Sequence, residues 1–225
     1  MIRQLGGILY KELLTELRQP ARVSGIFFFG LTLVLLVGIA APSTRAFEQF
    51  AAATLWLGLT LASTRSLDQS YAVELEHGAL EGLVLWPVDP RAIFYGKAIA
   101  TTLMLFCVCI GLTPFLLAMA DASVEGSIPL FLAFLVLGCA GLAAPGTLFG
   151  LIAGQARGSS VLLPLLLIPL LVPMLLAGAR GTMLVMQGGP GAEVEAPGWL
   201  QLLVLFNVLH WSLGGVFFSV VLESD

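Results

Sequence analysis

Six stretches of the chain carry no Asp, Glu, Lys or Arg over a length that suits a membrane crossing. They are residues 23–44, 49–64, 98–120, 126–156, 158–179 and 196–222. A helix of roughly 20 apolar residues spans the hydrocarbon core of a bilayer, and a helix satisfies its own backbone hydrogen bonds there. The pattern therefore predicts six transmembrane helices, centred near residues 32, 56, 108, 141, 170 and 210. The second is the shortest, and it requires Glu48 and Arg65 to lie at the two interfaces.

The composition supports a membrane protein with little room for a soluble domain. Apolar residues make up 58% of the 225 positions and charged residues 11%, whereas soluble domains carry about 25% charged residues. With 10 Lys and Arg against 14 Asp and Glu, the chain also lacks the basic excess of a nucleic-acid-binding protein. We expect an all-α integral membrane protein that forms a single transmembrane domain over residues 1–225.

The basic residues predict the orientation of the spans. With the N-terminus inside, eight Lys and Arg lie in inner segments, and only Arg45 and Arg180 lie in outer ones. Cytoplasmic loops carry such an excess, so we expect both termini of this multi-pass chain in the cytoplasm. The first apolar run is too long for the core of a cleaved signal peptide, and we interpret it as a retained span.

Residues 1–20 have the pattern of an amphipathic helix that lies along the inner membrane interface. One helical stripe is apolar and the opposite side is polar, and Pro20 ends the helix. The apolar stripe consists of Ile2, Leu5, Leu9, Leu13 and Leu17. Two interpretations remain open, namely a charged anchor that orients the first span and the elbow helix of a transporter.

Residues 65–97 form the only sizeable polar segment inside the chain and contain five acidic residues. On a helix, Glu74, His77 and Glu81 share one face, while apolar side chains cover the other side and Trp86-Pro87 ends the helix. We expect a short cytoplasmic helix that docks a soluble partner, although a solvated loop without a partner fits the charges too. The expected docking residues are Glu74, Glu76, His77, Leu80, Glu81 and Leu83.

Proline and glycine are concentrated in the fourth and fifth predicted spans. Interior prolines remove backbone donors and kink helices, and small residues let helices approach closely. The residues concerned are Pro145, Gly146, Pro164, Pro169 and Pro173. They indicate either a deformable bundle or static close packing. Residues 180–198 contain six Gly or Pro and predict a short, flexible outer loop.

The spans hold few groups that could carry chemistry. His210 is the only deep titratable side chain besides the cysteines; we expect it to be hydrogen-bonded inside the bundle with Asn207 as neighbour, and a haem or metal ligand is the less favoured interpretation. Cys107, Cys109 and Cys139 lack a metal-ligand spacing and are expected to pack as small apolar residues. The chain has no phosphate-binding loop, so any ATP must be bound by another chain. We therefore expect a non-catalytic subunit with no directly bound cofactor or metal.

Two blocks of sequence resemble the haem exporter protein B (CcmB) family, the membrane subunit of the cytochrome c maturation ABC transporter. Residues 74–90, ELEHGALEGLVLWPVDP, followed by GKA at 96–98, are similar to the cytoplasmic loop of that family. APG at 144–146, RG at 157–158 and LLPLLLIPLLVP at 162–173 are similar to a second family block, and KEL at 11–13 to its start. Glu74 and His77 stand where the family often has Asp, and Ala79 replaces Ser or Thr.

The resemblance implies an ABC-2-type permease of six spans in the bacterial inner membrane, with an elbow helix at 1–20 and a coupling helix within 65–97. Two copies would pair, and each would dock an ATP-binding subunit that holds ATP and Mg²⁺. The resemblance also implies a haem-handling membrane protein, a small single-span subunit and a periplasmic haem chaperone as partners, beside membrane lipid. Haem would be the cargo of the complex, either exported or released with the loaded chaperone. The alternative is an ABC-2 permease for a lipid, polysaccharide or drug.

Overall fold

The computed structural model describes residues 2–18, 20–76, 89–155 and 162–223, and all regular structure in these ranges is helical. The helices are α1 (Ile2–Arg18), α2 (Pro20–Ala40), α3 (Thr44–Glu76), α5 (Pro90–Ala120), α6 (Ile128–Gln155), α7 (Leu162–Gln187) and α8 (Gly189–Glu223). The predicted all-α class is thus confirmed for the part of the chain that is described.

Five of these helices are long and apolar enough to cross a membrane, judged by length and composition. They are α2, α5, α6, α7 and α8. The predicted second span falls on α3. This helix carries Arg45 and Glu48 in its first two turns, and it is less apolar than the other five. Five apolar crossings are therefore supported in the described residues, rather than the six that the sequence predicts.

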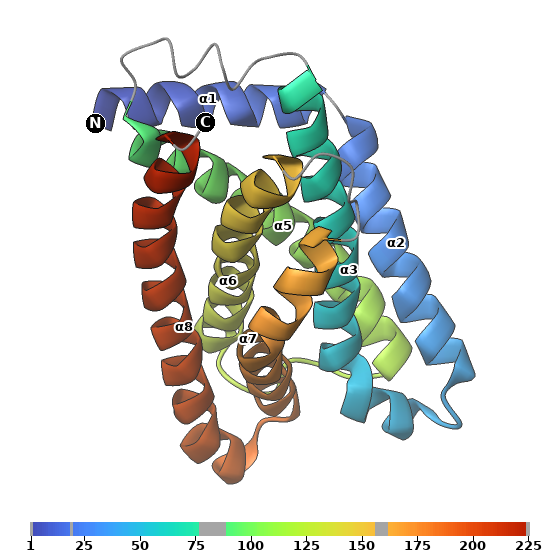
Figure 1. Ribbon diagram of the computed structural model, residues 1–225. Coiled ribbons are helices and arrows are strands. Elements are labelled where there is room, and N and C mark those ends of the chain that lie inside the picture. The colour runs from blue at the N-terminus through green and yellow to red at the C-terminus, as the bar shows by residue number, and fades with distance from the viewer. Residues whose placement is uncertain (1, 19, 77–88, 156–161, 224–225) are drawn as a thin grey trace.

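The long helices run alternately in opposite directions, and α1 lies across one end of the bundle (Figure 1). The alternation places the C-terminal ends of α3, α6 and α8 at the same end as α1. Helix α3 has 33 residues and is therefore about 50 Å long at 1.5 Å per residue. Because the hydrocarbon core is about 30 Å thick, α3 is long enough to reach well beyond it toward α1.

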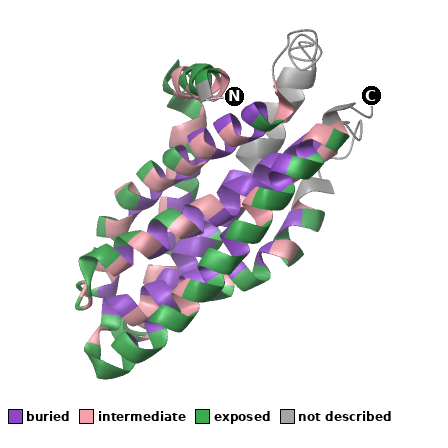
Figure 2. Ribbon diagram, turned by 90° about the vertical axis from the view of Figure 1, so that its left-hand side faces the viewer, coloured by how far each residue is buried: buried purple, intermediate pink, exposed green. Residues whose placement is uncertain are grey.

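The core is built around large aromatic side chains that pack on glycines. Trp56 of α3 is fully buried, and its indole nitrogen donates a 3.1 Å hydrogen bond to the Thr182 hydroxyl of α7. The Trp56 ring lies directly against Gly138 of α6 and Gly178 of α7, where even a Cβ atom would be in close contact with it. The exposed residues lie on the outer faces of the helices (Figure 2), where a bilayer would cover them.

The prediction of a flexible outer loop over residues 180–198 is wrong. Helix α7 continues to Gln187 and α8 begins at Gly189, so Gly188 alone connects them. Gly188 and Gly189 have positive φ angles of 65° and 87°, a conformation that glycine adopts without strain. The amides of Glu125 and Gly126 donate to the carbonyls of Met186 and Val185, which satisfies acceptors at the end of α7.

The polar segment predicted over residues 65–97 is largely helical at both ends. Its first part continues α3 to Glu76, and its last part belongs to α5. The Asp89 carboxylate accepts a 2.9 Å hydrogen bond from the Arg91 amide, and Pro90 occupies the first helical position. An N-cap aspartate followed by proline is a strong helix start, so Asp89-Pro90 begins α5.

Candidate functional site

Of the residues expected to dock a partner, the described part of the chain includes Glu74 and Glu76, at the end of the molecule that carries α1. Glu74 and Glu76 lie in the last turn of α3, whose side chains there are not described. His77, Leu80, Glu81 and Leu83 fall in 77–88, outside the described residues. What the structure does describe is the pair of helices that this segment joins, and the contact that α5 makes directly after it.

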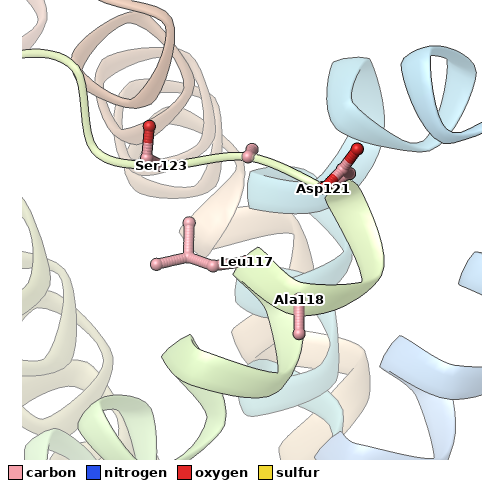
Figure 3. Close-up of a pocket in the computed structure, with 5 residues that line it drawn as sticks. Leu117, Ala118, Asp121 and Ser123 are labelled. Atoms are coloured by element: carbon pink, nitrogen blue, oxygen red, sulfur yellow. The ribbon is translucent and has the colours of Figure 1, made fainter.

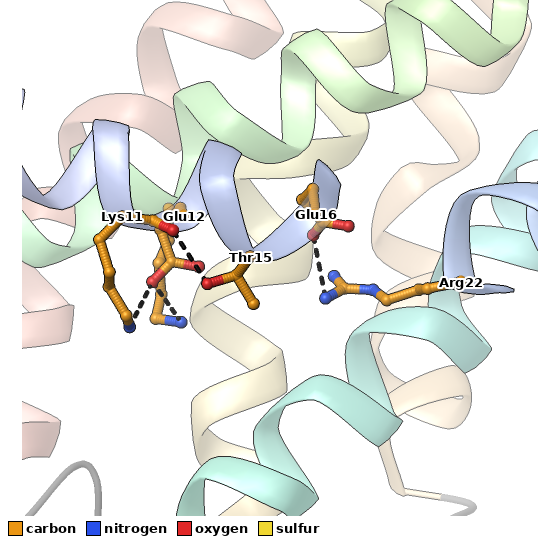
Figure 4. Close-up of polar contacts among 6 residues, drawn as sticks. Lys11, Glu12, Thr15, Glu16 and Arg22 are labelled. Atoms are coloured by element: carbon orange, nitrogen blue, oxygen red, sulfur yellow. Dashed lines mark hydrogen bonds and ion pairs between the residues drawn. The ribbon is translucent and has the colours of Figure 1, made fainter. Parts of the chain in front are cut away.

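Helix α1 is fastened to the first turns of α5 by a buried ion pair. The Lys97 ammonium of α5 lies 3.2 Å from Oε1 of Glu12, and Lys11 approaches the same oxygen at 2.9 Å (Figure 4). Glu12 and Lys97 expose only 11% and 7% of their side chains. Next to Lys97, a Cβ on Gly96 would lie 2.6 Å from Ile8 of α1. The two helices therefore touch through a glycine and are held by charge.

The electrostatics of the Glu12 carboxyl show that its ionised form is the favoured one. Burial by itself raises the pKa of Glu12, but Lys97 and Lys11 more than compensate and hold it below the ordinary value of 4.5. Nearby opposite charges stabilise an ionised carboxylate in this way. The ion pair is consequently complete at neutral pH.

A second ion pair fixes the corner between α1 and α2. Arg22 lies 2.9 Å from Oε1 of Glu16 (Figure 4). The other oxygen, Oε2, is buried and has no hydrogen-bond partner in the described part of the chain. Burial raises the pKa of Glu16, and Arg22 only partly opposes that effect.

The contact that orients α1 on the bundle is not one that its apolar stripe predicts. Glu12 is buried against the bundle, while Leu17 and Tyr10 are exposed over 79% and 69% of their surfaces. The sequence pattern could not reveal this, because it contains no sign that Glu12 meets Lys97, which is 85 positions further on. Both residues stand in segments quoted for the family resemblance, yet neither segment says that they touch.

The structure places the predicted kink and packing residues in different surroundings. Pro145 lies inside α6 beside the buried Gly146, and Pro169 and Pro173 lie inside α7. Pro164 instead lies in the first turn of α7, where a missing backbone donor costs little. Pro114 inside α5 was not singled out by the sequence analysis, although its place in a charge-free run was a usable signal.

The expected hydrogen bond between His210 and Asn207 does not form. The His210 Nδ1 atom lies 2.8 Å from the Phe206 carbonyl, and its ring stacks on that of Phe206. The Asn207 amide donates instead to the carbonyls of Leu137 and Leu203, at 2.9 and 2.8 Å. Asn207 therefore joins α8 to α6, and a packing role accounts for both residues.

No group of three or more His, Cys, Asp or Glu residues able to hold a metal is found among the described residues. Of the cysteines, Cys109 and Cys139 are buried and Cys107 is exposed. At the end opposite α1, a hollow of about 320 Å³ lies beside the last turn of α5 (Figure 3). It is lined by Leu117, Ala118, Asp121, Ala122 and Ser123.

The fold defines a class: a polytopic α-helical membrane protein whose described ion pairs gather at one end. The family model described as CcmB protein matches residues 3–223, so the chain belongs to the CcmB family. It is 33% identical over 190 residues to a heme exporter protein B of Rhodobacter capsulatus, covering 81% of this chain and 84% of the relative. Heme exporter protein B of Paracoccus denitrificans is 30% identical over 195 residues, covering 80% and 84%. The Pseudomonas aeruginosa protein of that name is 24% identical over 186 residues, covering 82% and 83%.

Proposed function

We propose that the chain is the permease subunit of an ABC-type haem exporter that serves the biogenesis of c-type cytochromes. The observation that carries this proposal is the match to the CcmB family over nearly the whole chain, together with relatives that are all named heme exporter protein B. A permease for a lipid, polysaccharide or drug is not favoured, because the family match leads to haem export instead.

The subunit is non-catalytic, and a partner chain binds and hydrolyses ATP with Mg²⁺. The partner docks on the segment between α3 and α5, through Glu74, Glu76, His77, Leu80, Glu81 and Leu83. Charged side chains on a short helix suit the recognition of a soluble subunit. The position of this segment supports the assignment, since α3 and α5 both have their ends at its borders.

Movement of the docked segment would reach α5 first and α1 with it. Helix α5 begins at Pro90, directly after the segment, and Lys97 two turns later is ion-paired with Glu12 of α1. Helices α1 and α5 would therefore shift as one unit when the ATPase changes state. Coupling of this kind requires only that the nucleotide-dependent contact favours one of two arrangements of the bundle. Proline-containing α6 and α7 are the helices that would deform.

We propose further that α3 is the sixth span and that α1 is an interfacial elbow helix in the bacterial inner membrane. Helix α3 is packed among α2, α5, α6 and α7, and its Trp56 is central to the core. Arg45 and Glu48 fall in its first two turns, at the level of the interface. The excess of basic residues at the α1 end supports a cytoplasmic location of both termini. The exposed Leu17 and Tyr10 of α1 would then enter the lipid surface.

The working complex would contain two copies of this chain, two ATP-binding subunits, a haem-handling membrane protein, a small single-span subunit and a periplasmic haem chaperone. Haem is the cargo. ATP hydrolysis either moves haem through the complex or releases the haem-loaded chaperone. The second mechanism is consistent with spans that carry hardly any ionisable groups.

Charge reversal tests the docking assignment. The variant Glu74→Lys/Glu81→Lys is expected to lose co-purification of the ATP-binding subunit and stimulation of its ATPase, because two attractive contacts become repulsive. The matched control is Glu193→Lys/Glu195→Lys, which reverses two exposed acids on α8 at the opposite end of the bundle. If the first variant retains the ATPase and its stimulation as fully as the control does, docking through this segment is disproved.

A further inference from the structure

An apolar groove opens beside the corner between α1 and α2, and one of its residues is a carboxylate with an unsatisfied oxygen. The groove has a volume of about 480 Å³, which is within the range of ordinary small-molecule sites. Val23 and Phe27 of α2 and Cys107 and Gly111 of α5 contribute to its walls, and Glu16 of α1 lies at its polar end. Its lining is otherwise almost entirely apolar.

The hydrogen bonding of Glu16 indicates which chemical group an occupant of the groove should carry. Oε1 is paired with Arg22, while Oε2 is buried without a hydrogen-bond partner in the described part of the chain. A buried acceptor left unsatisfied is costly, and the missing partner must be a donor. A cationic N–H donor is preferred, because charge-assisted hydrogen bonds to carboxylates are the strong ones.

The place of the groove in the fold identifies the source of that donor. It lies at the α1 end of α2, against the middle of α5, and extends from Glu16 toward Phe27, two turns into the first apolar span. An occupant that fits needs an apolar chain for the groove and a primary ammonium group at its head. A lipid of the inner leaflet has both when its headgroup is an ethanolamine. The positive charge of Arg22, next to Glu16, would attract the phosphate group of the same lipid.

We propose that this groove is a binding site for phosphatidylethanolamine, whose ammonium group donates to Oε2 of Glu16 while one acyl chain lies between α2 and α5. The lipid would brace the corner at which α1 joins the bundle, next to the Glu12–Lys97 ion pair. Haem is the less suitable occupant, because its two propionates would bring negative charge to a carboxylate. This proposal does not depend on the identity of the cargo.

Native mass spectrometry of the delipidated full-length protein, in its complex, tests the proposal. Phosphatidylethanolamine is compared with phosphatidylcholine of identical acyl chains, because the two carry the same charges and phosphatidylcholine has three N-methyl groups in place of the N–H donors. We expect the wild type to bind phosphatidylethanolamine about tenfold more tightly, the lower end of the range for one hydrogen bond to a charged group. Glu16→Gln should abolish this preference, and the control Glu195→Gln, at an exposed acid on α8, should retain it.

A second variant separates the groove from the head group. Cys107 is exposed and lines the groove, so the larger side chain of Cys107→Phe fills the groove without entering the core. This variant should weaken the binding of both lipids equally. Equal binding of the two lipids by the wild type would overturn the proposal, as would a preference that survives Glu16→Gln. Displacement of phosphatidylethanolamine by an equal concentration of haem would also overturn it, and would assign the groove to the cargo.

Discussion

Lys97 shows how one charged residue at a helix start can fix the position of a distant element. Its side chain is buried, and the carboxylate that neutralises it comes from α1. A buried charge is tolerated only with a partner, so α1 cannot move away from α5 without breaking the Glu12–Lys97 ion pair or bringing it into water. The same requirement makes this pair the best point at which to test the junction.

We expect Lys97→Met to destabilise the protein by about 3 kcal/mol at neutral pH, the lower end of the range for breaking a buried ion pair, because Lys11 still neutralises part of Glu12. The measurement is reversible unfolding in detergent. Arg91→Met is the control, since Arg91 is exposed on the same helix, and it should cost little. The double variant Glu12→Gln/Lys97→Met should recover part of the loss.

Lowering the pH should reduce the difference in unfolding free energy between the wild type and Lys97→Met. The pKa of Glu12 is lowered by Lys97 and Lys11, so the pair contributes its full stability above the ordinary value of 4.5 and loses it as the pH falls through the lowered value. Below that point Glu12 is protonated in both proteins, so the replacement of Lys97 no longer removes an ion pair with Glu12. A difference in unfolding free energy that stays constant down to pH 3 would show that the ion pair does not stabilise the contact between α1 and α5.

At the scale of the helices, glycine against an aromatic ring determines how closely neighbours approach. Gly138 of α6 faces the ring of Trp56 and Gly181 of α7 faces that of Phe134, and in both places a Cβ atom would overlap the ring. Such contacts make α6 the most enclosed of the five apolar helices, whereas α2 is the most peripheral. These residue pairs, rather than the prolines alone, set the packing of the bundle.

We expect Gly138→Ala to destabilise the protein by about 1–3 kcal/mol, the usual cost of overpacking a core, because Trp56 would have to leave its position and its bond to Thr182. Gly25→Ala on α2 is the control, since a Cβ there meets nothing within 4 Å. It should be neutral or slightly stabilising, as alanine favours a helix over glycine. Thermal unfolding of both variants, with Trp fluorescence as the probe, decides the point.

The helices show which parts of the fold could be predicted from the sequence. Charge-free runs located the apolar spans because lipid excludes ions at every position of a crossing. Residues 180–198 were misjudged because Gly and Pro usually end helices, whereas Pro190 lies in the first turn of α8 and the end of α7 is capped by Glu125 and Gly126. The capping amides are about sixty positions away, and no local pattern announces them.

The candidate site was predictable only in outline for the same reason. The acidic segment after α3 was located from its composition, but the Glu12–Lys97 contact, the Asn207 bonds to α6 and the groove at Glu16 join residues far apart in the chain. The prediction that Asn207 is the hydrogen-bond neighbour of His210 was wrong, because the Asn207 amide donates to backbone carbonyls of α6 and α8 instead. Composition thus defines the spans, while the contacts between them come from three-dimensional packing.

For the whole molecule, the alternation of the helices has a direct consequence. It brings α1, the end of α3, the start of α5 and the end of α8 together at one end of the bundle (Figure 1). A force applied between α3 and α5 therefore acts at the end where α1 is fastened to α5, and the far ends of the helices, with the α7–α8 turn, respond to it. This arrangement suits a subunit that receives motion and does no chemistry of its own.

Site-specific photo-crosslinking in the assembled complex tests this account most directly. A photoreactive residue at Leu83 should crosslink to the ATP-binding subunit, with a yield that changes between nucleotide-free and ATP-bound states. The same residue at Val194, which is 80% exposed on α8 at the opposite end, should give no such product. Crosslinking of the ATP-binding subunit at Val194 but not at Leu83 would contradict the account, as would labelling of a cysteine at position 83 by an impermeant reagent from the periplasmic side.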